Sequence, residues 1–137
     1  RSYVAGQRVL VDTGPLVALM NKRDRHHRRF VEYLRFFQGQ LVTTWPVLTE
    51  VTHHVPVGKA VEIIALVRDG ALEVIDLGNA GARVHDLMKK YADRPMDLAD
   101  ASLVWAAEHT GIEQVMTIDT DFAIFRLANG HRLQVLP

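Results

Sequence analysis

Residues 8–15 read RVLVDTGP, which joins a short apolar run, an acid and two signals for the start of a helix. The run at residues 8–11 has the length and the β-branched content of a buried strand. Thr13 is predicted as the N-cap of a helix, and Pro15 fits the first helical turn, where its missing N–H costs nothing. Asp12 therefore stands just past the carboxyl end of the first predicted strand.

The same alternation of strands and helices continues along the chain. Further strands are predicted at residues 41–44, 72–77, 114–118 and 132–136, the last as an edge strand. Helices are predicted at residues 16–20, 24–37, 47–55, 59–68, 79–91 and 97–110, with a break at Trp45–Pro46, a cap at Asn79 and a stop at Gly111. Strands separated by helices favour parallel pairing. The predicted class is α/β: a three-layer, Rossmann-like α/β/α domain with a mostly parallel central sheet.

Length and composition fit one globular domain. The chain has 137 residues, 48% of them hydrophobic, so a single domain over residues 1–137 is predicted, with residues 1–7 as an N-terminal tail. The absence of Cys excludes disulfide scaffolds, thiolate zinc sites and Cys nucleophiles. No apolar run approaches the ~20 residues of a membrane span, and residues 1–7 lack the order of a signal peptide. We expect a cytoplasmic protein with no membrane partner.

The charges balance in number but not in position. The chain carries 16 Lys and Arg against 16 Asp and Glu, which excludes a strongly basic nucleic-acid coat protein and an acidic disordered protein. The densest run of cations is KRDRHHRR at residues 22–29. Acids, in contrast, recur near the ends of predicted strands and at the start of a helix. The zero sum is therefore consistent with an acidic pocket beside a basic segment.

The acids near strand ends are the strongest functional signal from the residues themselves. Asp12 and Asp119 both follow strands, where open α/β sheets bind ligands at the switch point of strand order. Asp97 and Asp100 share a helix face, and Asp100 is on its apolar, inward side. Asp97 equally fits a first-turn acid that complements the helix dipole. Glu50 lies amid apolar residues, where a Glu is rarely buried unless paired, although an exposed position on the polar face fits as well.

Convergence of these carboxylates would require a cation. Like charges close together raise one another's pKa, and a divalent ion removes the repulsion. All-oxygen ligands favour Mg²⁺ or Mn²⁺, which commonly bridge carboxylates to a phosphate. Such a centre indicates phosphodiester hydrolysis by a metal-activated water.

Four short segments carry a resemblance to a known family. They are VDTG at residues 11–14, LTEV at 48–51, MDLADASL at 96–103 and TIDTDF at 117–122. In this order they resemble the acidic motifs of PIN-domain ribonucleases, many of which are VapC-like toxins of type II toxin–antitoxin pairs. The resemblance extends from about residue 9 to residue 135. Each motif is weak alone, whereas the four together are fairly specific.

The resemblance implies a Rossmann-like fold and a metal-dependent endoribonuclease, with Mg²⁺ or Mn²⁺ as cofactor. It also implies an RNA substrate, a small antitoxin as partner and a homodimer. Carried over by position, the catalytic and metal-binding acids are Asp12, Glu50, Asp100 and Asp119; Asp97 and Asp121 are further candidate metal ligands, and Thr13 and Thr117 are supporting hydroxyls.

Contacts to RNA are predicted from exposed cations and aromatic residues. An acidic pocket repels RNA unless cations flank it, so the arginines of the basic segment and Arg126 are candidates. The basic segment fits a solvated helix face as well, and Arg126 fits a salt bridge. Trp45 and Trp105 are predicted as core or interface residues, with base stacking as the alternative for Trp45. The predicted RNA-binding residues are Arg23, Arg25, Arg28, Arg29 and Arg126.

Two other enzyme and signalling classes are disfavoured. A receiver domain needs a Lys near the end of its last strand, and only Pro137 follows residues 132–136 here. A haloacid-dehalogenase-like phosphatase needs Asp-x-Asp after the first strand, whereas Asp12 is followed by Thr13 and Gly14. An RNA-processing nuclease and a binding-only subunit, without a toxin role, stay open beside the toxin hypothesis.

Overall fold

The computed structural model describes residues 7–137, so the predicted N-terminal tail lies, except for Gln7, outside the described residues. In chain order the elements are β1 (Arg8–Val11), α1 (Thr13–Met20), α2 (His27–Arg35), β2 (Gln40–Thr44), α3 (Trp45–His54), α4 (Val57–Arg68), β3 (Leu72–Ile75), α5 (Gly81–Lys90), α6 (Leu98–Thr110), β4 (Gln114–Met116), the 3₁₀ turn η1 (Thr120–Ala123) and β5 (Gln134–Leu136).

The five strands form one sheet in the order β3-β2-β1-β4-β5, and every neighbouring pair is parallel. The parallel sheet and the edge position of the last strand confirm the prediction. β1 lies at the centre, because β2 and β3 extend the sheet to one side and β4 and β5 to the other. The strand order therefore reverses between β1 and β4, whose carboxyl ends lie side by side at a ligand-binding position of open α/β sheets.

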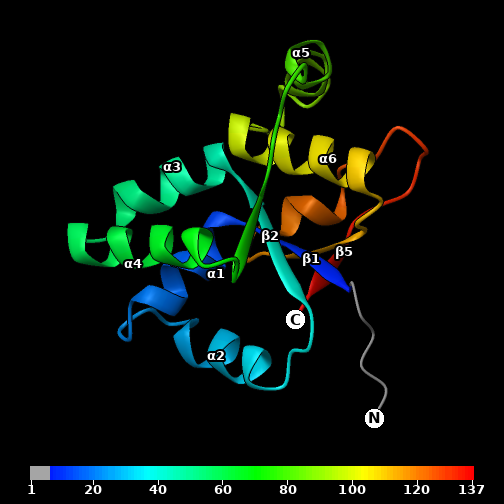
Figure 1. Cartoon of the computed structure of the whole chain (residues 1–137). Coiled ribbons are helices and arrows are strands. Elements are labelled where there is room, and N and C mark those ends of the chain that lie inside the picture. Colours follow the sequence, from blue (N-terminus) through cyan, green and yellow to red (C-terminus); the bar gives the residue numbers. More distant parts are fainter. Residues whose placement is uncertain (1–6) are drawn as a thin grey trace.

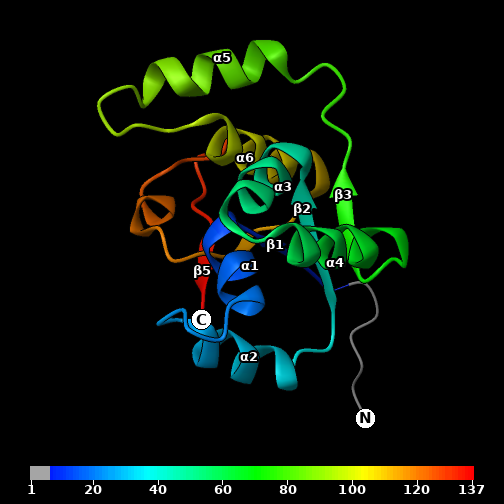
Figure 2. The same ribbon diagram turned by 90° about the vertical axis from the view of Figure 1, so that its left-hand side faces the viewer.

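Helices cover both faces of the sheet, which confirms the three-layer prediction. Figures 1 and 2 show α6 on one side of β1 and β2 and α2 on the other. α5 lies beyond α6, farther from the sheet (Figure 2). The N-terminal ends of α1 and α6 and the turn η1 gather at the carboxyl edge of the strands, which faces the viewer in Figure 2.

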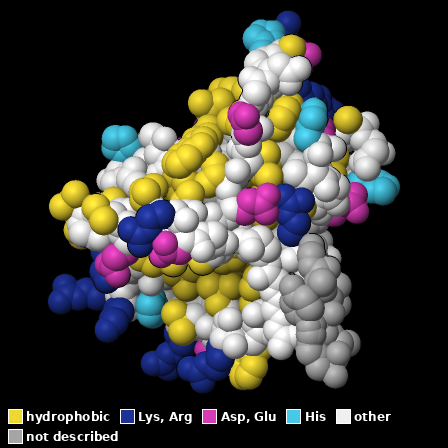
Figure 3. Space-filling view, in the orientation of Figure 1, with side chains coloured by type: hydrophobic (Ala, Val, Ile, Leu, Met, Phe, Trp, Pro, Cys, Tyr) yellow, Lys and Arg dark blue, Asp and Glu magenta, His cyan; other side chains and the backbone are white. Residues whose placement is uncertain are grey.

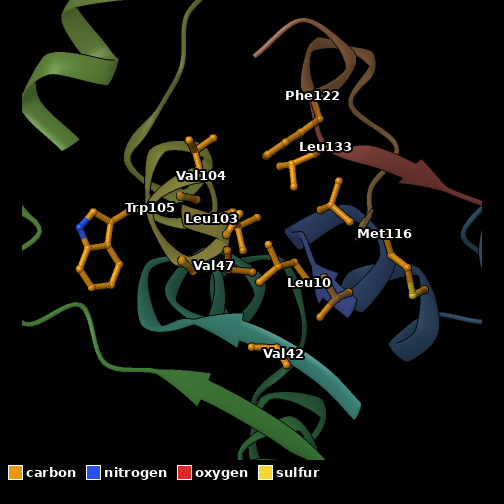
Figure 4. Packing of buried hydrophobic residues seen from close by; sticks show 14 of the residues in the cluster. Leu10, Val42, Val47, Leu103, Val104, Trp105, Met116, Phe122 and Leu133 are labelled. Carbon is orange, nitrogen blue, oxygen red and sulfur yellow. The ribbon is translucent and has the colours of Figure 1, made fainter. Parts of the chain in front are cut away.

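The core lies between the central strands and the α3–α6 layer. Leu10 of β1, Val47 of α3 and Leu103 of α6 are completely buried and lie together (Figure 4). Met116 and Phe122, on either side of the predicted acidic motif, are also fully buried. Burying side chains of this size contributes roughly 1.5–3 kcal/mol each, so the acids at the strand ends stand on a rigid base.

Two helix starts differ from the prediction for identifiable reasons. The N-cap of α1 is Asp12, and Thr13 is the first helical residue, because the Thr13 hydroxyl is bonded to a side chain from another helix. The break predicted at Trp45–Pro46 is absent, since Pro46 occupies the first turn of α3, where no N–H is needed. β2 consequently runs directly into α3.

Further boundaries are moved by side chains that bond to the backbone. The helix predicted from residue 24 begins at His27, because Asp24 Oδ1 accepts from the His26 N–H at 2.8 Å in a turn. Asn79 is not a cap; Ala80 is the N-cap of α5. The strand predicted to residue 118 ends at Met116, because the Thr117 hydroxyl accepts from the Asp119 N–H at 2.9 Å.

The helices of residues 7–137 include none that combines the length and the apolar character needed to cross a bilayer.

Candidate active site

Asp12 is fixed at the junction of the two central strands. Its backbone N–H donates to the Met116 carbonyl of β4 at 2.9 Å, which extends the strand pairing by one residue. Its carboxylate Oδ2 accepts from the Thr117 hydroxyl at 2.9 Å. The residue is only 7% exposed. The acid predicted after the first strand is therefore buried and oriented by a hydroxyl that follows β4.

Thr117 connects two of the predicted acids. Its Oγ1 donates to Asp12 and accepts from the Asp119 N–H at 2.9 Å. Asp119 in turn caps η1, since its Oδ1 accepts from the Asp121 N–H at 2.9 Å. Asp119 and Asp121 are both partly buried. The turn after β4 thus presents Asp119 next to Asp12 through one shared hydroxyl, the supporting role predicted for Thr117.

Glu50 is half-buried, not a fully solvated residue of the polar face of α3. Its Oε1 accepts from the Thr13 hydroxyl at 2.9 Å, which links α3 to the first residue of α1. Burial raises the pKa of Glu50, the Thr13 bond opposes this, and the charge of Asp97 raises the pKa further. The Glu50 carboxyl therefore faces the other acids.

Asp97 and Asp100 form a capping box at the start of α6. Asp97 Oδ1 accepts from the Asp100 N–H at 2.8 Å, and Asp100 Oδ2 accepts from the Asp97 N–H at 3.2 Å. The helix-start interpretation of Asp97 is therefore right, and its side chain is exposed. Asp100 is 8% exposed, as its inward-facing position predicts.

The electrostatics show that the acids act on one another. Burial raises the pKa of Asp12 from 3.8 to about 6, and the charges of Asp119 and Asp97 contribute. Burial raises the pKa of Asp100 to about 8, with further contributions from Asp97, Asp12 and Asp119. These mutual effects require the carboxylates to lie close together at the carboxyl edge of the sheet. Asp12, Asp97, Asp100 and Asp119 are therefore within electrostatic reach of one another, and Glu50 is within reach of Asp97.

The donor set fits a hard divalent cation, although no group of three or more His, Asp or Glu within residues 7–137 is arranged to hold an ion as it stands. Each carboxylate accepts a hydrogen bond from its own donor. Glu50, Asp100 and Asp119 use one oxygen each for these bonds and keep a second one. All these donors are carboxylate oxygens, the ligands that Mg²⁺ and Mn²⁺ prefer.

The predicted RNA-binding arginines lie on the surface, and none forms a hydrogen bond or ion pair with the predicted acids within the described residues. Arg23, Arg25, Arg28 and Arg29 are exposed, and Arg29 donates to the Pro137 carbonyl at 2.9 Å. Arg126 has no salt bridge within the described residues; its Nη1 donates to the Gly130 carbonyl at 3.1 Å. Contact with RNA stays a prediction for all five arginines.

Two further residues lie beside the acids: Arg94, which sequence reasoning missed, and Trp45, which it named as a base-stacking candidate. Arg94 Nη1 lies 3.8 Å from Asp121 Oδ1, which puts a half-exposed cation at the edge of the acidic group. Trp45 is 52% exposed and lines, with Glu50 and Leu98, an apolar hollow of about 510 Å³. The core alternative for Trp45 is wrong, and its interface and base-stacking alternatives stay predictions. Trp105 is buried and stacks on His109. Nothing in the residue spacing signals Arg94, because it meets the acids only through the fold.

Gly14 allows the start of α1 to pack against the turn that carries Thr117. A Cβ added at Gly14 would lie 2.5 Å from Ile118 Cγ1 and 2.7 Å from its Cδ1, so Ile118 must move. The clashing atoms are the outer part of the Ile118 side chain, which is 42% exposed and lies between Thr117 and Asp119, so relief requires Ile118 to change rotamer or the turn that carries both residues to shift. We expect Gly14→Ala to lower the cleavage rate roughly tenfold or more, because about 1 Å of misplacement at a site costs up to ~10²-fold.

The matched control is Gly58→Ala at the same second helical position of α4, where no described atom lies within 4 Å of the added Cβ. Thermal unfolding and cleavage rate are measured for both variants. Gly58→Ala should keep full activity and gain a few tenths of a kcal/mol up to ~1 kcal/mol from helix propensity. Equal activity of the two variants would refute the packing role of Gly14.

Comparison with known proteins agrees with the geometry. Residues 9–126 match the family model described as the PIN domain, and this range contains Asp12, Glu50, Asp100 and Asp119. The chain is 26% identical to ribonuclease VapC26 of Mycobacterium tuberculosis over 135 residues, which cover 94% of this chain and 100% of that relative. The solved structure of M. tuberculosis VapC20, a sarcin–ricin loop cleaving toxin, has the same fold, with a TM-score of 0.77 at 19% identity over 85% of this chain and 93% of that one. The chain belongs to the PIN domain family.

Proposed function

We propose that this protein is a Mg²⁺- or Mn²⁺-dependent endoribonuclease that hydrolyses RNA phosphodiester bonds in the cytoplasm as the toxin of a toxin–antitoxin pair. The observation that carries the proposal is the group of mutually perturbed carboxylates at the switch point, Asp12, Asp100 and Asp119. Membership of the PIN family and the likeness to a protein named ribonuclease VapC26 support it.

Each acid has a distinct part in the proposed reaction. Asp12, Asp100, Asp119 and Glu50 would hold the cation, with Asp97 and Asp121 at its edge. When bound, a divalent cation supplies a water of lowered pKa and neutralises charge on the phosphate oxygens. Thr117 holds the Asp12 carboxylate in place, and Thr13 does so for Glu50.

A cleavage panel tests the proposal directly. Transfer RNA, ribosomal RNA fragments including a sarcin–ricin loop, and single-stranded oligoribonucleotides are incubated with Mg²⁺, Mn²⁺ or EDTA. We expect cleavage by the wild type with either metal, none in EDTA, and none by Asp12→Asn. Asp86→Asn, at a surface acid of α5 whose side chain is 70% exposed, is the control with the same change of charge and should cleave normally.

A substrate that lacks the 2′-OH at the cleaved position separates hydrolysis from transesterification. Attack by water does not use the ribose 2′-OH, so a 2′-deoxy substitution at the cleaved position should leave cleavage intact. Full activity in EDTA would refute metal dependence, and 2′,3′-cyclic phosphate products that require this 2′-OH would refute hydrolysis by water.

We further propose a homodimer and a small antitoxin as protein partners. The surface of α4 supports partner binding, because Val57 is 81% and Val61 63% exposed, and Val61 and Ile64 line an apolar hollow of about 310 Å³. Light scattering after size exclusion gives the oligomeric state, and co-expression with a small reading frame upstream tests the antitoxin. Stable complex formation without nuclease activity would instead favour a binding-only subunit, and cleavage without any such partner an RNA-processing enzyme.

A further inference from the structure

A cleft beside the acids is lined by cations and contains no acid in its lining. It lies where the connection between α1 and α2 meets the turn between α3 and α4, and its volume is about 320 Å³. Its charged and imidazole side chains are Lys22, Arg23, Lys59 and His54. Figure 3 shows Lys and Arg side chains gathered at the lower left of the molecule, over the α1–α2 connection.

Two of these cations are available to a ligand. Lys22 and Arg23 are exposed, and neither takes part in an ion pair within residues 7–137. Lys59 is partly neutralised, since its Nζ lies 3.3 Å from Glu62 Oε2. The Arg23 N–H donates to Asn21 Oδ1 at 3.0 Å, which shapes the turn that brings Lys22 and Arg23 to the cleft. A net positive, concave surface of this kind attracts anions.

The cleft adjoins the acidic group through α3. His54 follows Glu50 by four residues, so the two side chains share one face of the helix about 5–6 Å apart. The charge of His54 lowers the pKa of the Glu50 carboxyl, which confirms that the two groups lie within electrostatic reach. His54 therefore connects the Glu50 side of α3 with the wall of the cleft.

We propose that this cleft binds the backbone phosphate next to the scissile one when a single-stranded RNA lies across the acids. This inference rests on the proposed function and adds a substrate subsite to it. Lys22 and Arg23 contact the phosphate oxygens, with Lys59 and His54 as the opposite wall. The acids alone repel RNA, so a cation-lined cleft one phosphate away supplies the attraction that they lack. Of the arginines predicted from sequence, only Arg23 lines this cleft; Arg25, Arg28 and Arg29 do not.

Binding is measured separately from cleavage. The affinity of a fluorescent single-stranded oligoribonucleotide is followed by anisotropy in EDTA over a series of salt concentrations. Lys22→Ala/Arg23→Ala is compared with Lys89→Ala/Arg132→Ala, which removes two exposed positive charges outside the cleft. We expect the first pair to lower affinity at least tenfold and to reduce the salt slope by about 0.7 for the lost phosphate contact. The control should stay within twofold of the wild type.

A neutral phosphate analogue locates the contact on the RNA. A methylphosphonate placed next to the scissile position should weaken binding by the wild type and have no further effect on Lys22→Ala/Arg23→Ala. Equal losses in the cleft and control pairs, or additive losses with the methylphosphonate, would overturn the subsite.

Two further outcomes distinguish the RNA subsite from the nuclease function and from binding of an acidic protein segment. RNA binding through the cleft by a protein that never cleaves would refute the nuclease and keep the subsite. If Lys22→Ala/Arg23→Ala binds RNA as tightly as the wild type but no longer binds poly-glutamate, the inference is overturned. The cleft would then be assigned to an acidic protein segment.

Discussion

Replacing Asp100 by Asn is expected to abolish metal-dependent RNA cleavage while making the metal-free protein more stable. The variant keeps the capping box, because an amide oxygen still accepts from the Asp97 N–H. It removes a carboxylate that is buried among three other acids, so the loss of cleavage should reach roughly 10²- to 10⁴-fold, the range one catalytic group supplies.

The gain in stability of Asp100→Asn comes from the burial of the Asp100 carboxylate. The folded protein raises the pKa of Asp100 to about 8, so above that pH the native state holds a charge that it disfavours. Removing this charge should raise the free energy of unfolding at pH 8 to 9 by an amount on the order of a few kcal/mol. Chemical denaturation in EDTA measures it.

Opposite effects on activity and stability identify a functional acid. Thr44→Val is the structural comparison, because the Thr44 hydroxyl forms a buried bond of 2.6 Å to the Ser102 hydroxyl and touches no acid. That variant should lose stability by about 0.5–1.5 kcal/mol, since one buried hydrogen bond is lost while the Ser102 hydroxyl keeps its bond of 2.7 Å to the Ala99 carbonyl. Loss of both stability and activity in Asp100→Asn would instead make Asp100 a structural residue.

The stability of the metal-free protein is expected to fall as the pH rises from about 4 to 8. The pKa values of Asp12 and Asp100 in the folded state are about 6 and about 8, above their ordinary value of 3.8. Folding therefore favours the protonated forms. Their contribution is fully present below about pH 4 and is lost as the pH rises through 6 and then 8.

Variants isolate this contribution from other titrating groups. Glu108 has the opposite sign, because Arg83 and the Ala128 N–H lower its pKa, so it stabilises the protein at neutral pH. The contribution of Glu108 is the same in the wild type and in Asp12→Asn/Asp100→Asn, so it cancels in the difference between their free energies of unfolding. That difference should grow by several kcal/mol, as an order of magnitude, between pH 4 and 9. A flat difference would show that the two acids titrate normally.

Added Mg²⁺ or Mn²⁺ should suppress the loss of stability that the metal-free protein shows as the pH rises. A cation bound only by the folded state adds RT ln(1 + [M]/Kd), and its binding improves as Asp12 and Asp100 lose their protons. The melting temperature of the wild type should therefore rise with metal at pH 8 and much less at pH 5. The double Asn variant should show no metal effect at either pH.

The amino-acid sequence was enough to predict the order of strands and helices, the parallel sheet and the position of Asp12 at a strand end. Short apolar runs followed by acids carry that information locally. The hydroxyl network was only partly predictable: Thr117 was suggested by resemblance, but its bond to Asp12 joins residues 105 apart and exists only through β1–β4 pairing. The convergence of Glu50 with Asp97 likewise depends on how α3 meets α6.

Some features had no local signal at all. The cation-lined cleft forms where two connections meet, and the basic run in residues 22–29 does not reveal that Lys22 and Arg23 face Lys59 while Arg25 does not. Only the core alternative for Trp45 was wrong, since Trp45 is 52% exposed at the start of α3. Helix starts moved by up to three residues where Asp24 and Thr13 used their side chains for other bonds.

The pairing of β1 with β4 makes the acidic group a late product of folding. Leu10 pairs with Val115, so a loop of more than a hundred residues closes before Asp12 meets Thr117 and Asp119. Such distant contacts are slow to form and are gained only with the complete sheet. A partly folded chain that already contains β1, β2 and β3 lacks the aligned acids. Catalytic competence and the cooperative native fold should therefore appear, and disappear, in a single transition.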